Sequence, residues 1–225
     1  MRPSKPPVLR NKLSVPIIVD AAIAILEEAG FSHFSMRRLA SALGVTATAI
    51  YHHIADKSSL LDLCAERILG RIPVPDPDAK WTVRLKTLIL DQQRVCLAFP
   101  GLARYLVSHR DSSAAAMLWM DGILEVMQRG GMDGPTALRA LIAMSFVLNP
   151  MTLIEDAPRK RKTSMMNKTW ASRVLKKNPG KFPHAAALLP HFGDLQDGGY
   201  FYESHFELAL DRLIAGLERE TATGA

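Results

Sequence analysis

The chain has 225 residues and a formal net charge of +6 at pH 7, with 48% hydrophobic and 22% charged residues. This length allows one large domain or a small domain followed by a medium one, and we favour two domains. No run of about eighteen uncharged apolar residues is found, and no apolar segment near the N-terminus resembles a signal peptide. We therefore expect a cytoplasmic protein with no membrane partner.

Two cysteines occur, Cys64 and Cys96, in segments that are predicted to be different helices. Because no secretion signal is recognised, buried thiols are the simplest interpretation of both. A redox switch is the alternative that the sequence leaves open.

The first segment in chain order, residues 1–12, is rich in proline and basic residues and is predicted to be a flexible arm. In a DNA-binding protein such an arm can reach into the adjacent minor groove. A cloning remnant or a plain disordered tail fits the composition equally well.

Helical periodicity is nearly continuous after the arm, and no alternating strand pattern competes with it, so the predicted fold class is all-α. The proline-rich stretch 72–78 is the best domain boundary. It separates a three-helix helix-turn-helix domain at 13–72, with a connecting helix at 57–71, from a helical ligand-binding and dimerisation bundle at 78–225. The expected helices are 15–29, 36–43, 47–53, 57–71, 80–98, 101–109, 112–130, 134–156, 168–178 and 200–219.

Residues 36–57 form the most informative stretch, which is predicted to be two short helices joined by a glycine turn. Ser35 can cap the first helix and Thr46 the second, because a hydroxyl oxygen accepts a bond from a free N–H of the first helical turn. Gly44 supplies the positive φ that ends the first helix. Helix–glycine–helix corners also occur in all-α proteins that bind no DNA.

The second helix of this pair is expected to bury Ile50 and Ile54, which leaves several small or polar side chains outward. Tyr51 and Thr48 can donate to phosphates or base edges, and alanine can touch a thymine methyl group. A lysine beside free N–H groups can clamp a phosphate. The candidate DNA-binding residues are Arg37, Thr46, Ala47, Thr48, Tyr51, His52, His53 and Lys57.

The string from Ser35 through Thr46, together with Ile50–Ile54 and Lys57, resembles the DNA-binding signature of the TetR family of bacterial one-component regulators. Residues 14–30 resemble the first helix of that family, so the resemblance covers roughly residues 13–65. It implies a homodimer whose last helices pack into a four-helix bundle and hold two reading heads over double-stranded operator DNA.

In the second domain, polar side chains interrupt apolar helical stripes, and a buried amide or hydroxyl needs a partner, which a ligand can supply. On helix 134–156 the inward side is predicted to carry Leu138, Leu141, Ile142, Ser145, Phe146, Asn149 and Thr152, with a kink at Pro150. The candidate ligand-binding residues are Gln92, Cys96, Trp119, Ser145 and Asn149. Polar groups bonded to backbone or water in an ordinary core are the alternative.

The last predicted helix, 200–219, is apolar on more than one side, as expected if it packs on its own core and on a partner subunit. Its main stripe is Tyr202, Phe206, Ala209, Leu213 and Leu217, flanked by Phe201, Leu208 and Leu210.

The strongest charge bias lies outside the helix-turn-helix. Residues 155–181 carry nine Lys or Arg against two Asp or Glu, whereas residues 182–225 carry two against seven. A solvated loop and exposed helix face explain the basic block most simply. Contact with neighbouring DNA and pairing with the acidic last helix of a partner chain are the alternatives.

Enzymatic activity is not expected, and neither is a metal or another cofactor, because the histidine groups lack a recognisable ligand spacing. Those groups are His52, His53 and Asp56, and His184, His191, Asp194 and His205. The predicted function is a dimeric transcriptional repressor that a small, largely apolar effector of unknown identity releases from its operator. A helical ligand- or partner-binding protein without DNA binding, and a TetR-type activator, are the alternatives.

Overall fold

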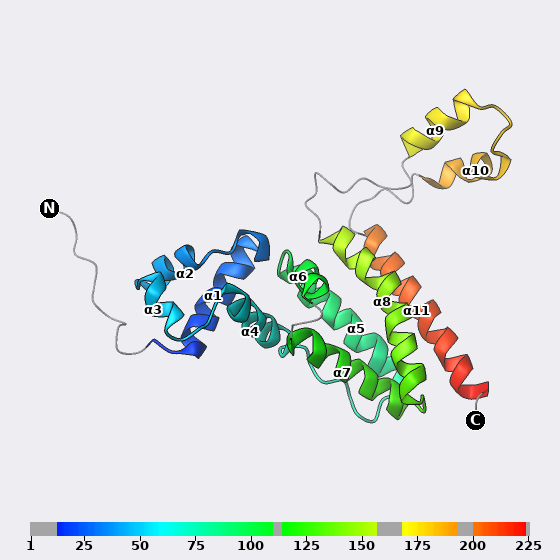
Figure 1. The fold of residues 1–225 in the computed structure, drawn as a ribbon. Coiled ribbons are helices and arrows are strands. Elements are labelled where there is room, and N and C mark those ends of the chain that lie inside the picture. Colours follow the sequence, from blue (N-terminus) through cyan, green and yellow to red (C-terminus); the bar gives the residue numbers. More distant parts are fainter. Residues whose placement is uncertain (1–12, 110–113, 157–167, 193–199, 224–225) are drawn as a thin grey trace.

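The computed structural model describes residues 13–109, 114–156, 168–192 and 200–223. The described residues are helical with short 3-10 turns and contain no strand, which confirms the all-α prediction. Figure 1 shows two packed groups of helices, with α1–α4 at one end and α5–α8 with α11 at the other. We call the first group the head and the second, with α9 and α10, the sensor domain.

The head is a compact group of helices around one apolar core. Its core is filled by side chains that are completely buried, among them Ile18, Leu26, Leu39, Ile50 and Leu60. Burial of such side chains is the dominant stabilising term in a domain of this size. Its elements are α1 (Val15–Ala29), the 3-10 turn η1 (Phe31–His33), α2 (Met36–Leu43), α3 (Ala47–Tyr51) and α4 (Lys57–Leu69).

Hydrogen bonds from the backbone to short polar side chains set the helix starts in the head. The Oγ atom of Ser35 accepts from the N–H of Arg38 at 3.2 Å, and Oγ1 of Thr46 accepts from Ala49 at 3.2 Å. Gly44 ends α2 with φ of 67°, in the left-handed region that favours glycine. The predicted caps and turn are therefore confirmed, although α3 ends two residues earlier than expected.

The sensor domain packs four long helices together, and Figure 1 shows α8 and α11 side by side. Leu85, Ile123, Met127, Phe206 and Leu210 form the centre of its core. The bundle helices are α5 (Trp81–Ala98), α6 (Leu102–Ser108), α7 (Ala114–Arg129), α8 (Gly134–Glu155) and α11 (Tyr200–Thr223).

Ion pairs within the chain attach α11 to α5. The Nζ atom of Lys86 lies 2.9 Å from Glu207 and 2.7 Å from Asp211, and Lys80 pairs with Glu218. Hydrogen bonds to the two carboxylates raise the pKa of Lys86 above its ordinary value. Three acidic residues of α11 thus already have basic partners in their own chain. This pairing disfavours the idea that they attract the basic block of a partner subunit.

A smaller pair of helices, α9 (Lys168–Lys177) and α10 (Pro183–Leu188), projects beyond the bundle and continues into η3 (Leu189–Phe192). Helix α10 was not predicted, because its six residues bury no side chain and so show no apolar stripe. Of the basic block, residues 157–167 lie outside the described residues, whereas Arg173, Lys176 and Lys177 are exposed.

Two predictions about side-chain direction in the sensor domain were only partly right. Leu138, Ile142 and Phe146 of α8 are exposed, Phe146 by 76%, because the core contacts the other side of the helix. On α11, Phe206 of the predicted stripe is buried and Ala209, Leu213 and Leu217 pack partly buried against the core, whereas the other fully buried positions are Leu210 and Ile214, outside that stripe. A helix that is apolar on several sides does not reveal by periodicity which side meets its own core. The side chains of Phe201 and Tyr202 lie outside the described residues.

Helix α8 also corrects the expectation that no segment is apolar enough to cross a membrane. Among the described residues it is the one helix that meets that criterion, by length and composition only. It continues through Pro150 to Glu155 and packs against α5, α7 and α11. The core helices of multi-helix domains often have this composition, and the exposed apolar side of α8 is considered below.

One backbone hydrogen bond joins the head to the α5–α6 turn of the sensor domain. The N–H of Phe31 donates to the carbonyl oxygen of Pro100 at 2.8 Å. Gly30 makes this approach possible, because a Cβ atom there would lie 2.6 Å from the same oxygen. The next residue, Gly101, donates its N–H to both carboxylate oxygens of Asp156 at 3.0 Å. We call this contact the junction, and it links the end of α8 to the head.

Candidate DNA interface and effector pocket

Helix α3 turns its apolar side into the head and leaves its other side open. Ile50 and Ile54 are buried, whereas Thr48, Tyr51, His52 and His53 are exposed, Tyr51 by 46%. Ala47 and Ala49 are half-buried, which leaves their backbone near the surface. This arrangement offers a donor-rich helical surface narrow enough for a major groove.

The two arginines of α2 differ in availability. Arg38 pairs with Glu28 of α1, with 2.8 Å between Nη2 and Oε2. Arg37 is exposed and makes no ion pair within the described residues. An unpaired guanidinium can contact a phosphate or a guanine without first breaking a salt bridge, so Arg37 is the better candidate.

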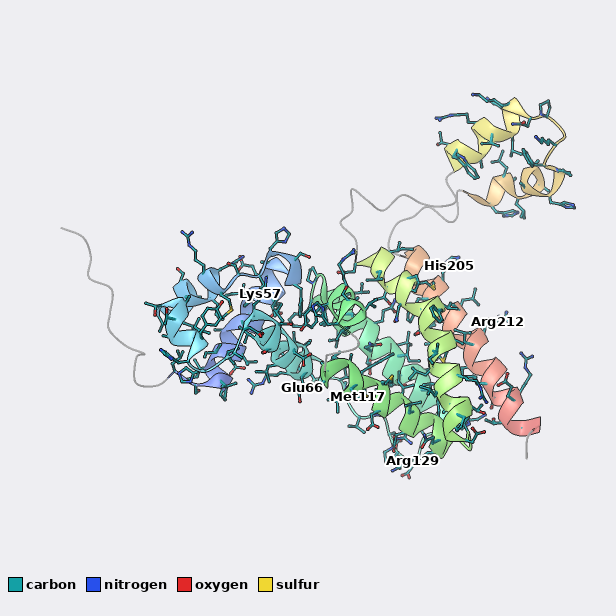
Figure 2. All side chains as sticks on the ribbon, viewed as in Figure 1. Lys57, Glu66, Met117, Arg129, His205 and Arg212 are labelled. Carbon is teal, nitrogen blue, oxygen red and sulfur yellow. The ribbon has the colours of Figure 1, made fainter. Side chains whose placement is uncertain are left out.

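The side chain of Lys57 contacts Phe34 within the head, which the sequence did not predict. It starts α4 at the head (Figure 2), and its Nζ donates to the carbonyl oxygen of Phe34 at 2.8 Å. The same ammonium group lies 5.7 Å from the centre of the Phe34 ring. Lys57 therefore stabilises the entry to α2, and its contact with a phosphate stays a prediction.

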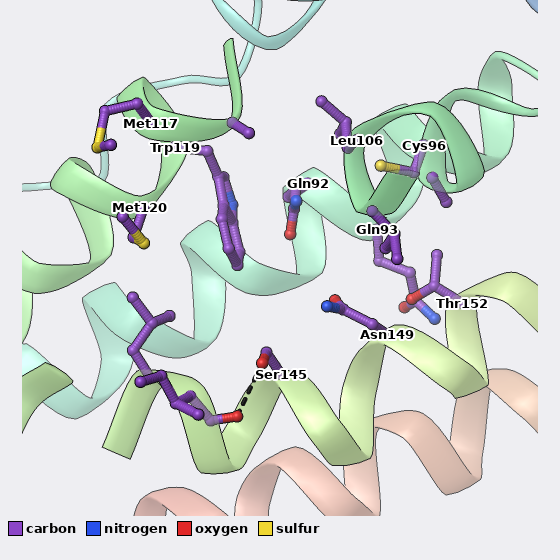
Figure 3. Close-up of a pocket in the computed structure, with 15 residues that line it drawn as sticks. Gln92, Gln93, Cys96, Leu106, Met117, Trp119, Met120, Ser145, Asn149 and Thr152 are labelled. Carbon is purple, nitrogen blue, oxygen red and sulfur yellow. Dashed lines mark hydrogen bonds between the residues drawn. The ribbon is translucent and has the colours of Figure 1, made fainter. Parts of the chain in front are cut away.

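A pocket with an empty volume of about 840 Å³, partly open to solvent, lies among α5, α6, α7 and α8. Figure 3 shows Trp119, Gln92 and Asn149 arranged around this space, from three different helices. We call it the effector pocket. Its lining has no charged side chain and consists of Gln92, Gln93, Cys96, Ala103, Leu106, Val107, Ala116, Met117, Trp119, Met120, Leu141, Ile142, Ser145, Asn149 and Thr152.

Several polar groups at the effector pocket have unused hydrogen-bonding capacity. The indole N–H of Trp119 is buried and has no acceptor among the described residues. The amides of Gln92, Gln93 and Asn149 likewise have no hydrogen-bond partner within the described residues. Leaving a buried donor unpaired costs about 1–3 kcal/mol, so a ligand that accepts from Trp119 would recover that energy.

The two hydroxyl groups of the pocket are already bonded to their own helix. Ser145 donates to the carbonyl oxygen of Ile142 at 2.7 Å, and Thr152 donates to that of Leu148 at 3.2 Å. Their oxygens still have lone pairs that can accept from a ligand. The amides and the indole are therefore the main donors of the pocket.

Both cysteines are buried and unpaired, as the sequence analysis expected. Burial raises the pKa of Cys96, and also that of Cys64, to about 12. A thiol with such a pKa is protonated at neutral pH and is a poor nucleophile. Cys96 thus contributes a small apolar surface to the pocket wall.

All five predicted ligand-binding residues line the same pocket, but their contact with a ligand stays a prediction. The sequence analysis did not assign Gln93, which is only 6% exposed. The feature of the sequence that points to Gln93 is its position directly after Gln92, in a helix with many apolar residues. Helix α5 is covered by other helices from several directions, so that neighbouring positions such as Gln92 and Gln93 both lie inside.

The histidine groups do not assemble into a metal site in the described part of the chain. No three or more His, Cys, Asp or Glu side chains come together there in a way that could hold a metal ion. Asp194, which the sequence analysis had considered with His191, lies outside the described residues.

Comparison with known proteins places both domains. The family model described as "Bacterial regulatory proteins, tetR family" matches residues 18–64. The model described as "Tetracyclin repressor-like, C-terminal domain" matches residues 74–221. The first match ends at residue 64 and the second begins at residue 74.

Individual relatives match over nearly the whole chain. The transcriptional repressor DrrR1 of Streptomyces coeruleorubidus is 27% identical over 96% of this chain and 81% of its own length. The class C tetracycline repressor of Escherichia coli is 28% identical over 95% of this chain and 94% of its own length.

Among solved structures, ActR of Streptomyces coelicolor in complex with actinorhodin superposes with a TM-score of 0.75 and 26% identity. The match covers 96% of this chain and 100% of ActR. Relatives of this kind are transcriptional regulators and not enzymes. Since the C-terminal family model alone spans well over half of the sequence, the chain belongs to the TetR family of bacterial transcriptional regulators.

Proposed function

We propose that this TetR-family repressor binds operator DNA as a homodimer and is released when an uncharged small molecule enters the effector pocket. The observation that carries the proposal is the unpartnered indole N–H of Trp119 beside three unpartnered amides in a pocket without charge. That pocket belongs to the domain that is hydrogen-bonded to the head. The operator lies in the bacterial cytoplasm, so the protein acts there.

DNA reading rests on few side chains. Thr48 and Arg37 are the candidates for contact with base edges, while Tyr51 and His53 hold the phosphate backbone. Ala47 and Ala49 allow close approach but carry no side-chain donor. Specificity therefore depends strongly on the spacing of two heads along the duplex.

The exposed apolar side of α8 supports the dimer. Leu138, Phe146, Val147 and Ile154 are each at least 40% exposed there, and Leu208 is exposed on the neighbouring α11. Several large apolar side chains exposed on one pair of neighbouring helices are typical of a protein–protein interface. A second copy that places its own α8 and α11 against this surface forms a four-helix bundle and covers these side chains.

The lining of the effector pocket indicates the chemistry of the effector. Met117, Met120 and Leu106 favour an apolar body, and the methionines can adapt to an irregular shape. A carbonyl or ether oxygen would accept from Trp119, and the amides of Gln92 and Asn149 can pair with hydroxyl or carbonyl groups. An ionised effector would lose its hydration without gaining a counter-ion. ActR, a relative, has been solved in complex with actinorhodin.

The junction provides a physical route from the pocket to the head. Helix α8 lines the pocket with Ser145 and Asn149, and the residue that follows it, Asp156, accepts from the N–H of Gly101. Helix α6 also lines the pocket, and the hydroxyl of its Tyr105 donates to the carbonyl oxygen of Ser58 in α4 at 3.3 Å. An effector that moves α6 therefore displaces the head. A hundredfold loss of operator affinity requires a difference of about 3 kcal/mol between the two states.

The test is titration of a labelled duplex from the upstream region of the protein's own gene, by fluorescence anisotropy at several salt concentrations. We expect affinity to fall steeply as salt rises, because each phosphate contact releases a counterion. A scrambled duplex of equal length, the control, should bind more weakly at every salt concentration. Absence of salt-sensitive binding to any duplex would refute the proposed function.

A further inference from the structure

A second concave site lies on the other side of Trp119 from the effector pocket. It is a groove between the linker that follows α4 and the helices α5 and α7, with an empty volume of about 830 Å³ that is partly open to solvent. We call it the linker groove. Its walls are Leu69, Gly70, Ile72, Pro73, Val74, Pro75, Arg84, Leu88, Leu118, Trp119, Gly122, Glu125 and Val126.

Arg84 is the unusual residue of this groove. It is only 6% exposed, and its Nε atom is buried without a hydrogen-bond partner among the described residues. The nearest carboxylate oxygen, Oε2 of Glu125, lies 3.6 Å from Nη2, which is too long for a good hydrogen bond. A buried guanidinium normally has well-formed partners, because removal of a charge from water is costly.

The carboxylate of Glu125 does not fully neutralise the charge of Arg84, because it also pairs with Arg129. Its other oxygen, Oε1, lies 2.5 Å from Nε of Arg129, one helical turn further along α7. Two guanidinium groups thus compete for one carboxylate, which leaves one positive charge in excess at this cluster. The remaining groove walls are almost entirely apolar.

We propose that the linker groove binds an amphipathic monocarboxylate, with the carboxylate on Arg84 and the apolar tail along the linker. The Nε–H and the adjoining Nη–H of arginine form a planar fork that matches a carboxylate. A single negative charge equals the local excess, whereas a phosphate monoester carries nearly two charges at pH 7. Ile72, Val74 and Leu118 supply apolar surface for the tail.

The position of the groove connects this ligand to the head. Leu69 is the last residue of α4 and Gly70 follows it, and the first turn of α4 contacts the entry to α2 through Lys57. A ligand in the groove would therefore contact the C-terminal end of α4, and α4 is part of the head. This site is separate from the effector pocket, and the two share only Trp119 in their walls.

The test is isothermal titration calorimetry of the full-length protein with octanoate, and with 1-octanol as the uncharged probe of equal chain length. Octanoate is expected to bind once per chain and about tenfold or more tightly than octanol, because a charge-assisted pair is lost with the alcohol. Arg84→Gln should weaken octanoate binding about tenfold or more and leave octanol binding unchanged.

Two further variants distinguish the groove from other sites. Arg212→Gln removes the same charge from the exposed side of α11 (Figure 2), outside the groove lining and away from Glu125, and should leave octanoate affinity within about twofold. Gly122→Leu should fill the groove and weaken binding, because a Cβ there meets only Leu88, at 4.0 Å. The proposal is overturned if octanoate does not bind, if octanol binds equally well, or if Arg84→Gln has no effect.

Discussion

The helix starts of the head and the walls of the effector pocket use their polar side chains in different ways. In the head, Ser35, Thr46 and Asp56 each accept a backbone hydrogen bond at a helix start. In the sensor domain, Trp119 and Asn149 face a pocket and have no partner within the described residues. A polar group with a backbone partner stabilises the fold, whereas one without a partner is available to a ligand.

The largest expected effect concerns the junction between the head and the sensor domain. Gly30→Ala places a Cβ 2.6 Å from the carbonyl oxygen of Pro100 at a backbone φ of 76°. We expect a loss of about 3 kcal/mol in the free energy of unfolding, measured with urea, from backbone strain and steric overlap together. Gly131→Ala is the matched control, since Gly131 has φ of 96° but nothing within 4 Å of its Cβ position. Equal losses in both variants would mean that the contact with Pro100 contributes nothing.

Exchange of a polar side chain for an apolar one tests the comparison directly. Asn149→Leu should leave the free energy of unfolding within about 0.5 kcal/mol, because the amide has no partner to lose. Thr46→Ala should lower it by about 1 kcal/mol, since the cap to Ala49 disappears.

The response to the effector should show the opposite pattern, because Asn149 lines the effector pocket and Thr46 does not. Asn149→Leu is expected to raise the effector concentration needed to release the operator about tenfold, with unchanged affinity for the operator itself. If the effector releases this variant from the operator at the same concentration as the wild type, Asn149 is an ordinary core residue that does not contact the effector.

A smaller change, in operator affinity, is expected for a substitution on the exposed side of α3. Tyr51→Ala should lower operator affinity by about 1 kcal/mol, roughly fivefold, without a change in the dimer mass measured by light scattering. Tyr51→Phe keeps the ring and removes the hydroxyl, so it separates stacking and packing from donation to a phosphate. If Tyr51→Ala binds the operator as the wild type does, α3 does not present this side to DNA.

The smallest expected effect is on acid stability. Hydrogen bonds from Ser59 lower the pKa of Asp56 below its ordinary value of 3.8, and those from Thr136 do the same for Asp133 at the start of α8. A lowered pKa contributes stability above the unfolded value, and this contribution is lost as pH falls through the folded value. Asp56→Asn, which keeps a capping side chain, should therefore flatten the loss of stability below about pH 4.

The measurement is the urea midpoint at pH 7, 4 and 3 for Asp56→Asn and for Asp133→Asn. Asp121→Asn on the exposed side of α7, where no capping bond is made, is the control and should follow the wild type. Because the two capping carboxylates lie in different domains, similar changes would indicate that both domains unfold together. A wild-type profile in both capping variants would refute the contribution of these bonds.

Local features of the head could be predicted from the sequence because their causes lie within a few residues. The caps at Ser35 and Thr46 and the positive φ of Gly44 depend on the adjacent turn alone. Burial of Ile50 and Ile54 followed from helical spacing on an otherwise polar helix. The sensor domain was harder, since Phe146 lies outward on a helix that is apolar on nearly all sides.

The sequence by itself determined the all-α class, the helix-turn-helix with its outward residues, and the five ligand candidates that share one pocket. Only the tertiary structure decided that Gln93 joins them, that Lys57 is held by Phe34, and that Arg84 is buried without a full partner. Caps and turns depend on neighbours along the chain, which the sequence displays. Whether a polar side chain finds a partner depends on helices brought together from distant parts of the chain, and only the packed molecule answers that question.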